Sequence, residues 1–288
     1  MFSAMAILLF LAILLLGVRS TYGNGQKVCS LQEKGVSDDN TIPGSASLLK
    51  KSGPKHFSLD VQEHDSLSRS IQKISNILEL GGKAAIVGVD LQVAFADVNG
   101  SLYVSNGLEA VIGMNRLRAS FSQLPYILTQ DFHPPNHISF AVTHGKELFT
   151  LVQNMTAPGI DEAFDQMLWP VHAVENTEDA MFHPLLNTTG AIVVKKGTNP
   201  YVDSYSGFGD IFRGKYETTI FKKTLENLNI NTLFICGLAT DYCVLYTVLD
   251  AIRHGYTVYF IQDCSRGVNP ETTNLAIKQM EEAGALII

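Results

Sequence analysis

The chain has 288 residues, of which 46% are hydrophobic, so it can bury the core of one sizeable globular domain. Its formal net charge is −7 at pH 7, and no basic cluster is interleaved with aromatic residues, which argues against nucleic acid as a partner. The spacing of the four cysteines matches no compact disulfide framework.

Residues 1–20 form a hydrophobic leader. An apolar run from Ala4 to Leu16 is followed by small and polar residues, as in a secretory signal peptide, and it is shorter than the ~20 apolar residues of a membrane-spanning helix. Because Arg19 follows the apolar core instead of preceding it, a signal anchor is the alternative. We expect a secreted protein with no stable membrane span. Three glycosylation sequons are consistent with that route, at Asn99, Asn154 and Asn187.

Residues 21–82 are predicted to be an N-terminal extension that carries one helix. Its first part, 21–59, is rich in Gly, Ser, Lys and Asp, which is the composition of a loop or linker. Apolar residues at helical spacing then precede Gly81 and Gly82, namely Leu67, Ile71, Ile74 and Leu78. We expect one amphipathic helix over 60–80 that packs on the main domain.

The remainder, 83–288, alternates between strand and helix patterns. Apolar runs rich in β-forming residues occur at 84–89, 125–129, 191–194, 232–236, 256–261 and 285–288. Helical patterns occur at roughly 105–122, 214–228, 243–254 and 271–283. This alternation predicts an α/β fold, a three-layer αβα sandwich around a mainly parallel six-stranded sheet. The stretch 131–190 has little periodicity but many His, Pro and aromatic residues, and we expect it to carry function.

Polar residues follow four of the predicted strands, at the edge where parallel sheets bind ligands. They are Asp90, Asp131, the pair Lys195–Lys196 and Cys243. A carboxylate, an amine and a thiol in one place can perform amide hydrolysis, since the acid takes the thiol proton and returns it to the leaving amine. Cys243 lies near the expected start of a helix, so we expect its pKa to be lowered. The alternative is that Cys243 is an ordinary small buried residue.

A second cluster suggests a metal site. Asp131 and His133 form an Asp-x-His pair, His137 follows, and His172 comes from a distant segment. A mixed set of oxygen and nitrogen ligands suits Zn, Fe or Mn, and an open position would leave room for water or a ring nitrogen.

Five segments resemble the motif set of the nicotinamidases, which are metal-dependent members of the isochorismatase-like cysteine hydrolase family. They are DLQVAF at 90–95, TQDFHPPNHISFA at 129–141, WPVHAV at 169–174, KKGTNPYVDSYSGF at 195–208 and GLATDYCV at 237–244. The resemblance covers 83–288, which it identifies as an isochorismatase-like catalytic domain. It implies an enzyme of NAD metabolism and pyridine nucleotide salvage, which converts nicotinamide and water to nicotinate and ammonia through a cysteine thioester.

The resemblance also implies roles for individual residues. The catalytic triad would be Asp90, Lys196 and Cys243, with Lys196 preferred to Lys195 because the family's lysine directly precedes a glycine, here Gly197. One divalent metal ion, zinc first, with iron or manganese as alternatives, would be held by a further set of three residues. These are Asp131, His133 and His172, and His137 would be a possible ligand or lie behind the ligands.

The substrate pocket is implied in the same way. The backbone N–H groups of Ala239 and Cys243 would form the oxyanion hole, with a cis peptide bond between Leu238 and Ala239. Phe95 and Trp169 would flank the pyridine ring, although both could instead be ordinary core residues. Two further readings stay open: another isochorismatase-like hydrolase acting on a different amide or a vinyl ether, and a catalytically silent secreted binding protein of the same fold.

Overall fold

The computed structural model describes residues 60–288, with side chains from residue 66 onward. The expected signal peptide at 1–20 and the linker at 21–59 lie outside the described residues, as does Cys29. No helix of the described part has the length and hydrophobicity needed to cross a bilayer.

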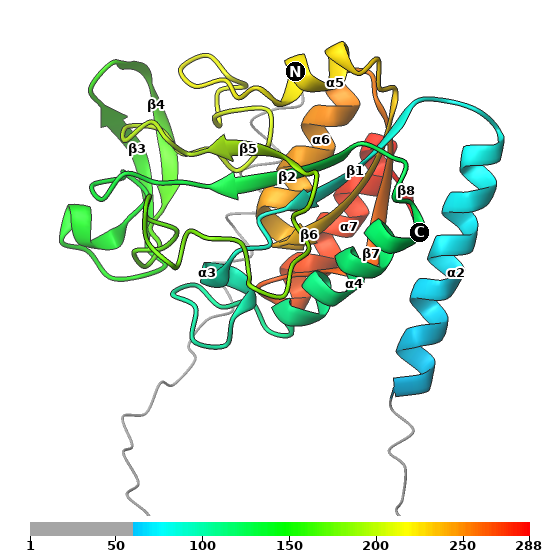
Figure 1. Cartoon of the computed structure of the whole chain (residues 1–288). Coiled ribbons are helices and arrows are strands. Elements are labelled where there is room, and N and C mark those ends of the chain that lie inside the picture. The colour runs from blue at the N-terminus through cyan, green and yellow to red at the C-terminus, as the bar shows by residue number, and fades with distance from the viewer. Residues whose placement is uncertain (1–59) are drawn as a thin grey trace, which may run out of the picture. The chain divides into compact units, whose positions relative to one another are not determined.

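A six-stranded sheet forms the centre of the domain, and all of its neighbouring strands are parallel (Figure 1). Its strand order is β5-β2-β1-β6-β7-β8. The strands are β1 (Ala84–Val89), β2 (Tyr126–Asp131), β5 (Ile192–Lys196), β6 (Thr232–Leu238), β7 (Thr257–Arg266) and β8 (Leu286–Ile287). All six strands predicted from the apolar runs are therefore confirmed.

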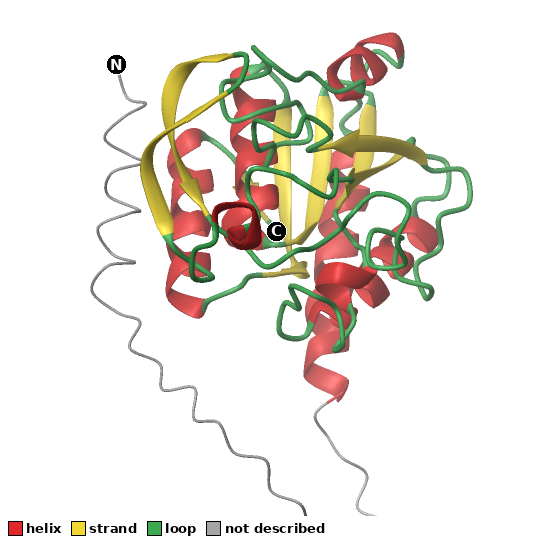
Figure 2. Ribbon diagram, turned by 90° about the vertical axis from the view of Figure 1, so that its left-hand side faces the viewer, coloured by secondary structure: helices red, strands yellow, loops and turns green. Residues whose placement is uncertain are grey.

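Helices cover both faces of the sheet, as a three-layer sandwich requires (Figure 2). Side chains alternate along a strand, so Ile86 packs with α4 (Gly107–Ser120) on one face. Its neighbour Val87 packs on the opposite face, in the core that includes α5 (Phe221–Asn227), α6 (Leu245–Arg253) and α7 (Pro270–Ala283).

Two predictions about the elements need correction. An antiparallel hairpin, β3 (Leu151–Ala157) and β4 (Ile160–Met167), lies inside the stretch that showed little periodicity. Only Met155, Phe164 and Gln166 of the hairpin are buried, so it lacks a continuous apolar run. The helix expected over 214–228 is shorter, because the Asp210 carboxylate accepts the backbone N–H groups of Phe212, Gly214, Tyr216 and Glu217 and holds this segment in turns.

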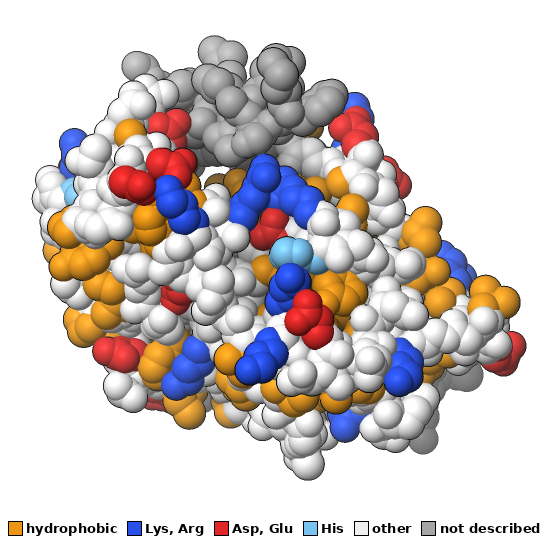
Figure 3. Space-filling view, turned by 90° about the horizontal axis from the view of Figure 1, so that it is seen from above, with side chains coloured by type: hydrophobic (Ala, Val, Ile, Leu, Met, Phe, Trp, Pro, Cys, Tyr) orange, Lys and Arg blue, Asp and Glu red, His pale blue; other side chains and the backbone are white. Residues whose placement is uncertain are grey.

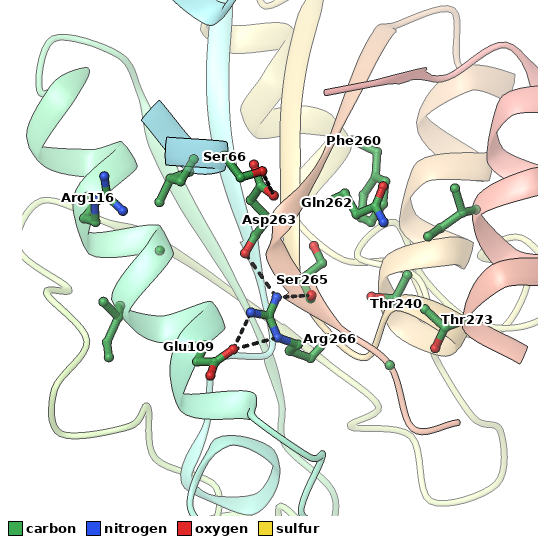
Figure 4. A pocket seen from close by; sticks show the side chains of 15 residues that line it. Ser66, Glu109, Arg116, Thr240, Phe260, Gln262, Asp263, Ser265, Arg266 and Thr273 are labelled. Atoms are coloured by element: carbon green, nitrogen blue, oxygen red, sulfur yellow. Dashed lines mark hydrogen bonds and ion pairs between the residues drawn. The ribbon is translucent and has the colours of Figure 1, made fainter. Parts of the chain in front are cut away.

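The predicted N-terminal helix is present as α2 (Asp60–Glu79) and packs against α4 and β7. Leu67 and Ile74 are buried in the core shared with α4. The hydroxyls of Ser66 and Ser70 donate to the two carboxylate oxygens of Asp263 on β7, at 2.6 and 2.9 Å. Ser66 and Asp263 face each other in Figure 4.

The strand order places a crevice beside β1. The chain moves from β1 to β2 on one side and later returns to β6 on the other, so connections diverge at the carboxyl ends of β1 and β6. Asp90 follows β1, and a short helix, α3 (Val93–Ala96), comes next. A π-helical turn, η2 (Thr240–Val244), follows β6 and contains Cys243.

On the face shown in Figure 3, basic and acidic side chains are interspersed with apolar ones.

Candidate active site and metal centre

Asp90 lies at the carboxyl end of β1 and is fully buried. Its backbone has φ 48°, and its Oδ1 accepts a hydrogen bond of 2.6 Å from the Thr129 hydroxyl. Its Oδ2 forms an ion pair with Nζ of Lys196 at 3.0 Å. Burial raises the pKa of Asp90, while the Lys196 charge opposes the shift. The two oxygens of this buried carboxyl therefore face different groups, the Thr129 hydroxyl and the Lys196 ammonium.

Lys196 ends β5 and connects the groups of the site. Its ammonium donates to the Asp131 carboxylate, to the Ser204 carbonyl at 3.0 Å and to Sγ of Cys243 at 3.4 Å. Burial alone would lower its pKa, but Asp131 and Asp90 raise the pKa well above its usual value. Lys196 is therefore a permanent cation that links the thiol to both carboxylates.

The thiol of Cys243 differs from the expectation. Burial raises the pKa of Cys243 and the nearby carboxylates add to the shift, so the Lys196 charge does not reverse it. Cys243 also lies inside the π-turn that begins at Thr240, not at an open helix end. The lowered pKa predicted from sequence is therefore wrong for the free protein, where burial keeps Cys243 a neutral thiol. Cys236 and Cys264 are buried free thiols.

The predicted metal ligands are close together. Atoms of Asp131, His133 and His172 that could bind a cation all lie within 4.8 Å of one another, and all three residues are buried. Nδ1 of His133 donates to the Gly197 carbonyl and Nδ1 of His172 to the Pro170 carbonyl, each at 2.8 Å. Both rings therefore keep Nε2 free of the backbone, and this is the nitrogen that can bind a metal ion once it carries no proton.

Asp131 is the third possible ligand, and only one of its two carboxylate oxygens is bound to Lys196. Oδ1 accepts from Lys196, and Oδ2 lies 3.7 Å from Nε2 of His133. Burial alone would raise the pKa of Asp131, but Lys196 and His133 hold it well below its usual value. The Gln92 amide fixes the Asp131 backbone by donating to its carbonyl and accepting its N–H, both at 2.8 Å. An anionic oxygen and two imidazole nitrogens make a donor set that fits a divalent metal ion.

His137 lies beside this cluster and stacks on His133 with ring centroids 4.1 Å apart. Burial and the nearby His133 lower the pKa of His137 to about 3. Its nearest carboxylate is Asp203, which the sequence analysis did not single out. Asp203 is buried and accepts from the Gln166 amide at 2.9 Å and from the Ser204 N–H at 2.8 Å. His133, His137 and Asp203 form a second group of possible ligands.

A narrow pocket connects the thiol to the Asp131 cluster. Its lining includes Cys243, Asp131, His133, His172, Asp203, Ala239, Val268, Phe95, Trp169, Tyr205 and Tyr242. Nε1 of Trp169 donates to the Tyr205 hydroxyl at 3.0 Å, and its ring meets Tyr242 edge-on at 4.9 Å. Tyr205 and Tyr242 were missed as pocket residues, although both lie within motifs that were recognised. The cis peptide bond expected between Leu238 and Ala239 is present.

A larger cavity of about 780 Å³ lies beside α2, α4 and β7 (Figure 4). Several of its polar groups bind one another: Arg266 donates to Glu109 and to the Asp263 and Ser265 carbonyls, and the Asp263 carboxylate accepts from Ser66. Cys243 and the cluster of Asp131, His133 and His172 line the smaller pocket and not this cavity, so the candidate site is the smaller pocket.

Comparison with known proteins matches residues 84–288 to the isochorismatase domain family. The chain is 43% identical to the nicotinamidase of Escherichia coli over 70% of this chain and 93% of that protein. The yeast nicotinamidase bound to the inhibitor nicotinaldehyde superposes with a TM-score of 0.66 at 28% identity, over 71% of this chain and 99% of that chain. The pyrazinamidase of Pyrococcus horikoshii in complex with zinc superposes with a TM-score of 0.58 at 31% identity, over 72% of this chain and 98% of that chain.

Proposed function

The chain belongs to the isochorismatase domain family, and on that premise we propose that it is a nicotinamidase, which converts nicotinamide and water to nicotinate and ammonia. One observation carries the proposal. The Asp90 carboxyl, the Lys196 ammonium and the Cys243 thiol meet beside a buried Asp-His-His cluster, and the pocket that reaches Cys243 and this cluster is lined mainly by aromatic and other apolar side chains. Relatives named nicotinamidases from four other organisms support the same activity.

Cys243 is the nucleophile. Asp90 accepts the thiol proton as Sγ bonds to the carboxamide carbon, and the backbone N–H groups of Ala239 and Cys243 donate to the oxygen that becomes negative. The tetrahedral intermediate collapses when Asp90 returns the proton to the nitrogen, which leaves as ammonia and breaks the C–N bond. Lys196 keeps its proton throughout and stabilises the charges on either side of it.

The second half of the reaction regenerates the thiol. Water attacks the carbonyl carbon of the thioester while Asp90 accepts a proton from it, and the C–S bond breaks as nicotinate is released. The thiolate then recovers the proton from Asp90. Each cycle consumes one amide and one water, and Asp90 carries the proton of the thiol and one proton of the water. The other water proton stays on the new carboxyl group, which loses it to solvent to become nicotinate.

Asp131, His133 and His172 would hold one divalent cation, with His137 beside them. When bound, the cation supplies a Lewis acid that can hold the ring nitrogen of the substrate. We propose zinc, because the oxygen and nitrogen ligands suit it and the related pyrazinamidase of Pyrococcus horikoshii was crystallised with it. Phe95 and Trp169 would pack against the two faces of the ring, with Tyr205 and Tyr242 closing the pocket.

We also propose that the protein follows the secretory route, with residues 1–20 as its signal peptide. The exposure of Asn99, Asn154 and Asn187 supports this, because a glycan needs an accessible asparagine. The check is the mass of the chain secreted by a eukaryotic host, before and after enzymatic removal of N-glycans. An unchanged mass would contradict glycosylation.

The function is tested by measuring ammonia release and bound metal on the same purified protein. We expect one divalent metal ion per chain, release of ammonia from nicotinamide and from its analogue pyrazinamide, and loss of both activities after chelation with recovery when metal is added back. Activity that survives complete metal removal would contradict the metal site. Hydrolysis of some other amide, with none of nicotinamide, would identify a different isochorismatase-like hydrolase.

A further inference from the structure

A buried carboxylate stands two residues before the thiol, in the same π-turn. Asp241 is fully buried, and three donors bind it. Oδ1 accepts from the Val268 N–H at 2.9 Å, and Oδ2 accepts from the Asn269 N–H at 3.2 Å and the Thr272 hydroxyl at 2.5 Å. The proposed reaction gives this carboxylate no role.

The three donors belong to the segment that leads into α7. Asn269 is the N-cap of α7, and its own side chain accepts from the N–H groups of Glu271 and Thr272. Val268 lines the substrate pocket together with Cys243. Asp241 therefore ties together two walls of one pocket, the turn that carries the thiol and the loop that faces it.

Physical reasons make this tie strong and specific. A buried carboxylate is tolerated when N–H and O–H groups bind it, and its charge sits at the N-terminal end of α7, where the helix dipole favours an anion. A π-turn is an uncommon conformation that tertiary contacts must support. Asparagine has the same shape but only one accepting oxygen, so its NH₂ group would face one set of donors.

We propose that Asp241 is a positioning residue: it fixes the π-turn against the loop at Val268, so that Sγ of Cys243 stays in the pocket facing Lys196 and Asp90. This proposal rests on the assignment of Cys243 as the reactive thiol. Without the tie, the turn and the loop can separate, which misplaces the sulfur for attack and opens a path from solvent to a thiol that is 8% exposed.

The test compares Asp241→Asn with the double variant S66A/S70A, which removes two hydrogen bonds from another carboxylate, Asp263, in contact with neither the thiol nor the pocket. Two quantities are measured well below the unfolding temperature: kcat for ammonia release, and the rate of Cys243 alkylation by iodoacetamide, followed by peptide mass spectrometry. Alkylation needs no substrate, so it reports on the turn even if nicotinamide is not the substrate.

For Asp241→Asn we expect opposite changes: kcat falls about 10- to 100-fold, the scale of a misplaced reactive group, while alkylation becomes several-fold faster. S66A/S70A should leave both within twofold of wild type. T272V removes one of the three hydrogen bonds and keeps the Asp241 carboxylate, so it should lower kcat and speed alkylation by smaller factors. If Asp241→Asn does not fold, T272V takes its place in the comparison. Variants with both quantities at wild-type values, or with changes matched by S66A/S70A, would overturn the proposal.

Discussion

Among the single residues of the site, Cys243 is subject to two opposing effects on the pKa of its thiol. The Lys196 ammonium, 3.4 Å from Sγ, favours the thiolate, whereas burial and the carboxylates of Asp90 and Asp131 favour the thiol. The balance raises the pKa of Cys243, so the free protein holds a neutral thiol. The proposed reaction therefore needs Asp90 to accept the thiol proton, and burial favours this because it raises the pKa of Asp90.

The raised pKa predicts how alkylation of Cys243 depends on pH. A thiol with a raised pKa is neutral at pH 7, so its reaction with iodoacetamide should be slow there and should still accelerate as the pH rises past the usual value of 9.0. Peptide mass spectrometry separates Cys243 from Cys236 and Cys264, which have no exposed surface. A rate that reaches its plateau below pH 7 would show a preformed thiolate and contradict this balance.

The sequence predicts which residues lie together at this edge of the sheet, but it does not predict their protonation states. Asp90, Lys196 and Cys243 follow buried strands, so the parallel sheet alone brings them to one edge. The pKa of Cys243 depends on how completely other segments exclude water, and no local pattern encodes that. Asp203 was overlooked for a similar reason, because its partner Gln166 comes from the hairpin, 37 residues away.

At the scale of elements, the turn after β5 shows how backbone geometry serves the metal centre. Gly197 has φ 64°, a left-handed conformation that side chains disfavour. A Cβ atom at this position would lie 2.4 Å from Cε1 of His133. The same residue's carbonyl accepts from Nδ1 of His133. Glycine is therefore required both for the turn and for the place of the imidazole.

Gly197→Ala should displace His133 and weaken metal binding by at least tenfold, in addition to a strain of about 1–2 kcal/mol for the left-handed backbone. Gly159→Ala is the matched control, because it has φ 75° and nothing within 4 Å of the new Cβ. Metal affinity is measured by competition with a chromophoric chelator, and stability by urea unfolding. Equal metal affinity in the two variants would contradict the role of Gly197.

The elements were predictable where burial leaves a pattern. The central strands β1, β2 and β6 are buried along almost their whole length, so they form apolar runs in the sequence. The hairpin of β3 and β4 has only three buried residues and gives no such signal. The π-turn was read as the start of an ordinary helix, because one extra residue per turn changes hydrogen bonding without changing the composition.

At the scale of the whole molecule, α2 belongs physically to the catalytic domain although the family match begins only at residue 84. Its buried Ile74 and Leu67 join the core on the α4 face, and its serines bind Asp263. The sequence predicted this packing from the helical spacing of apolar residues. The start of the family match at residue 84 therefore does not mark the edge of the folded domain, because α2 and the matched residues share one core.

Ile74→Ala should therefore lower the free energy of unfolding of the catalytic domain by about 2–4 kcal/mol, the usual cost of truncating a buried isoleucine. Leu80→Ala, at a position that is 87% exposed just beyond α2, should change it by less than about 0.5 kcal/mol. Urea unfolding followed by the fluorescence of the single tryptophan measures both. Similar values for the two variants would mean that α2 contributes nothing to domain stability.

The arrangement of the sheet accounts for the position of the active site. The connections diverge on either side of β1, which leaves a crevice at the carboxyl ends of β1 and β6, and the acid and the thiol follow those two strands. The β5 and β2 strands bring Lys196 and Asp131 to the same edge. The account therefore makes one claim about chemistry, that amide cleavage proceeds through the sulfur of Cys243.

The most direct test is the initial rate of ammonia release from nicotinamide by wild-type protein and by Cys243→Ala, both with their full metal content and with matching circular dichroism. We predict that wild type releases ammonia and that the variant's rate falls to the background without enzyme. A Cys243→Ala protein that still turned over nicotinamide at the wild-type rate would contradict covalent catalysis by this thiol.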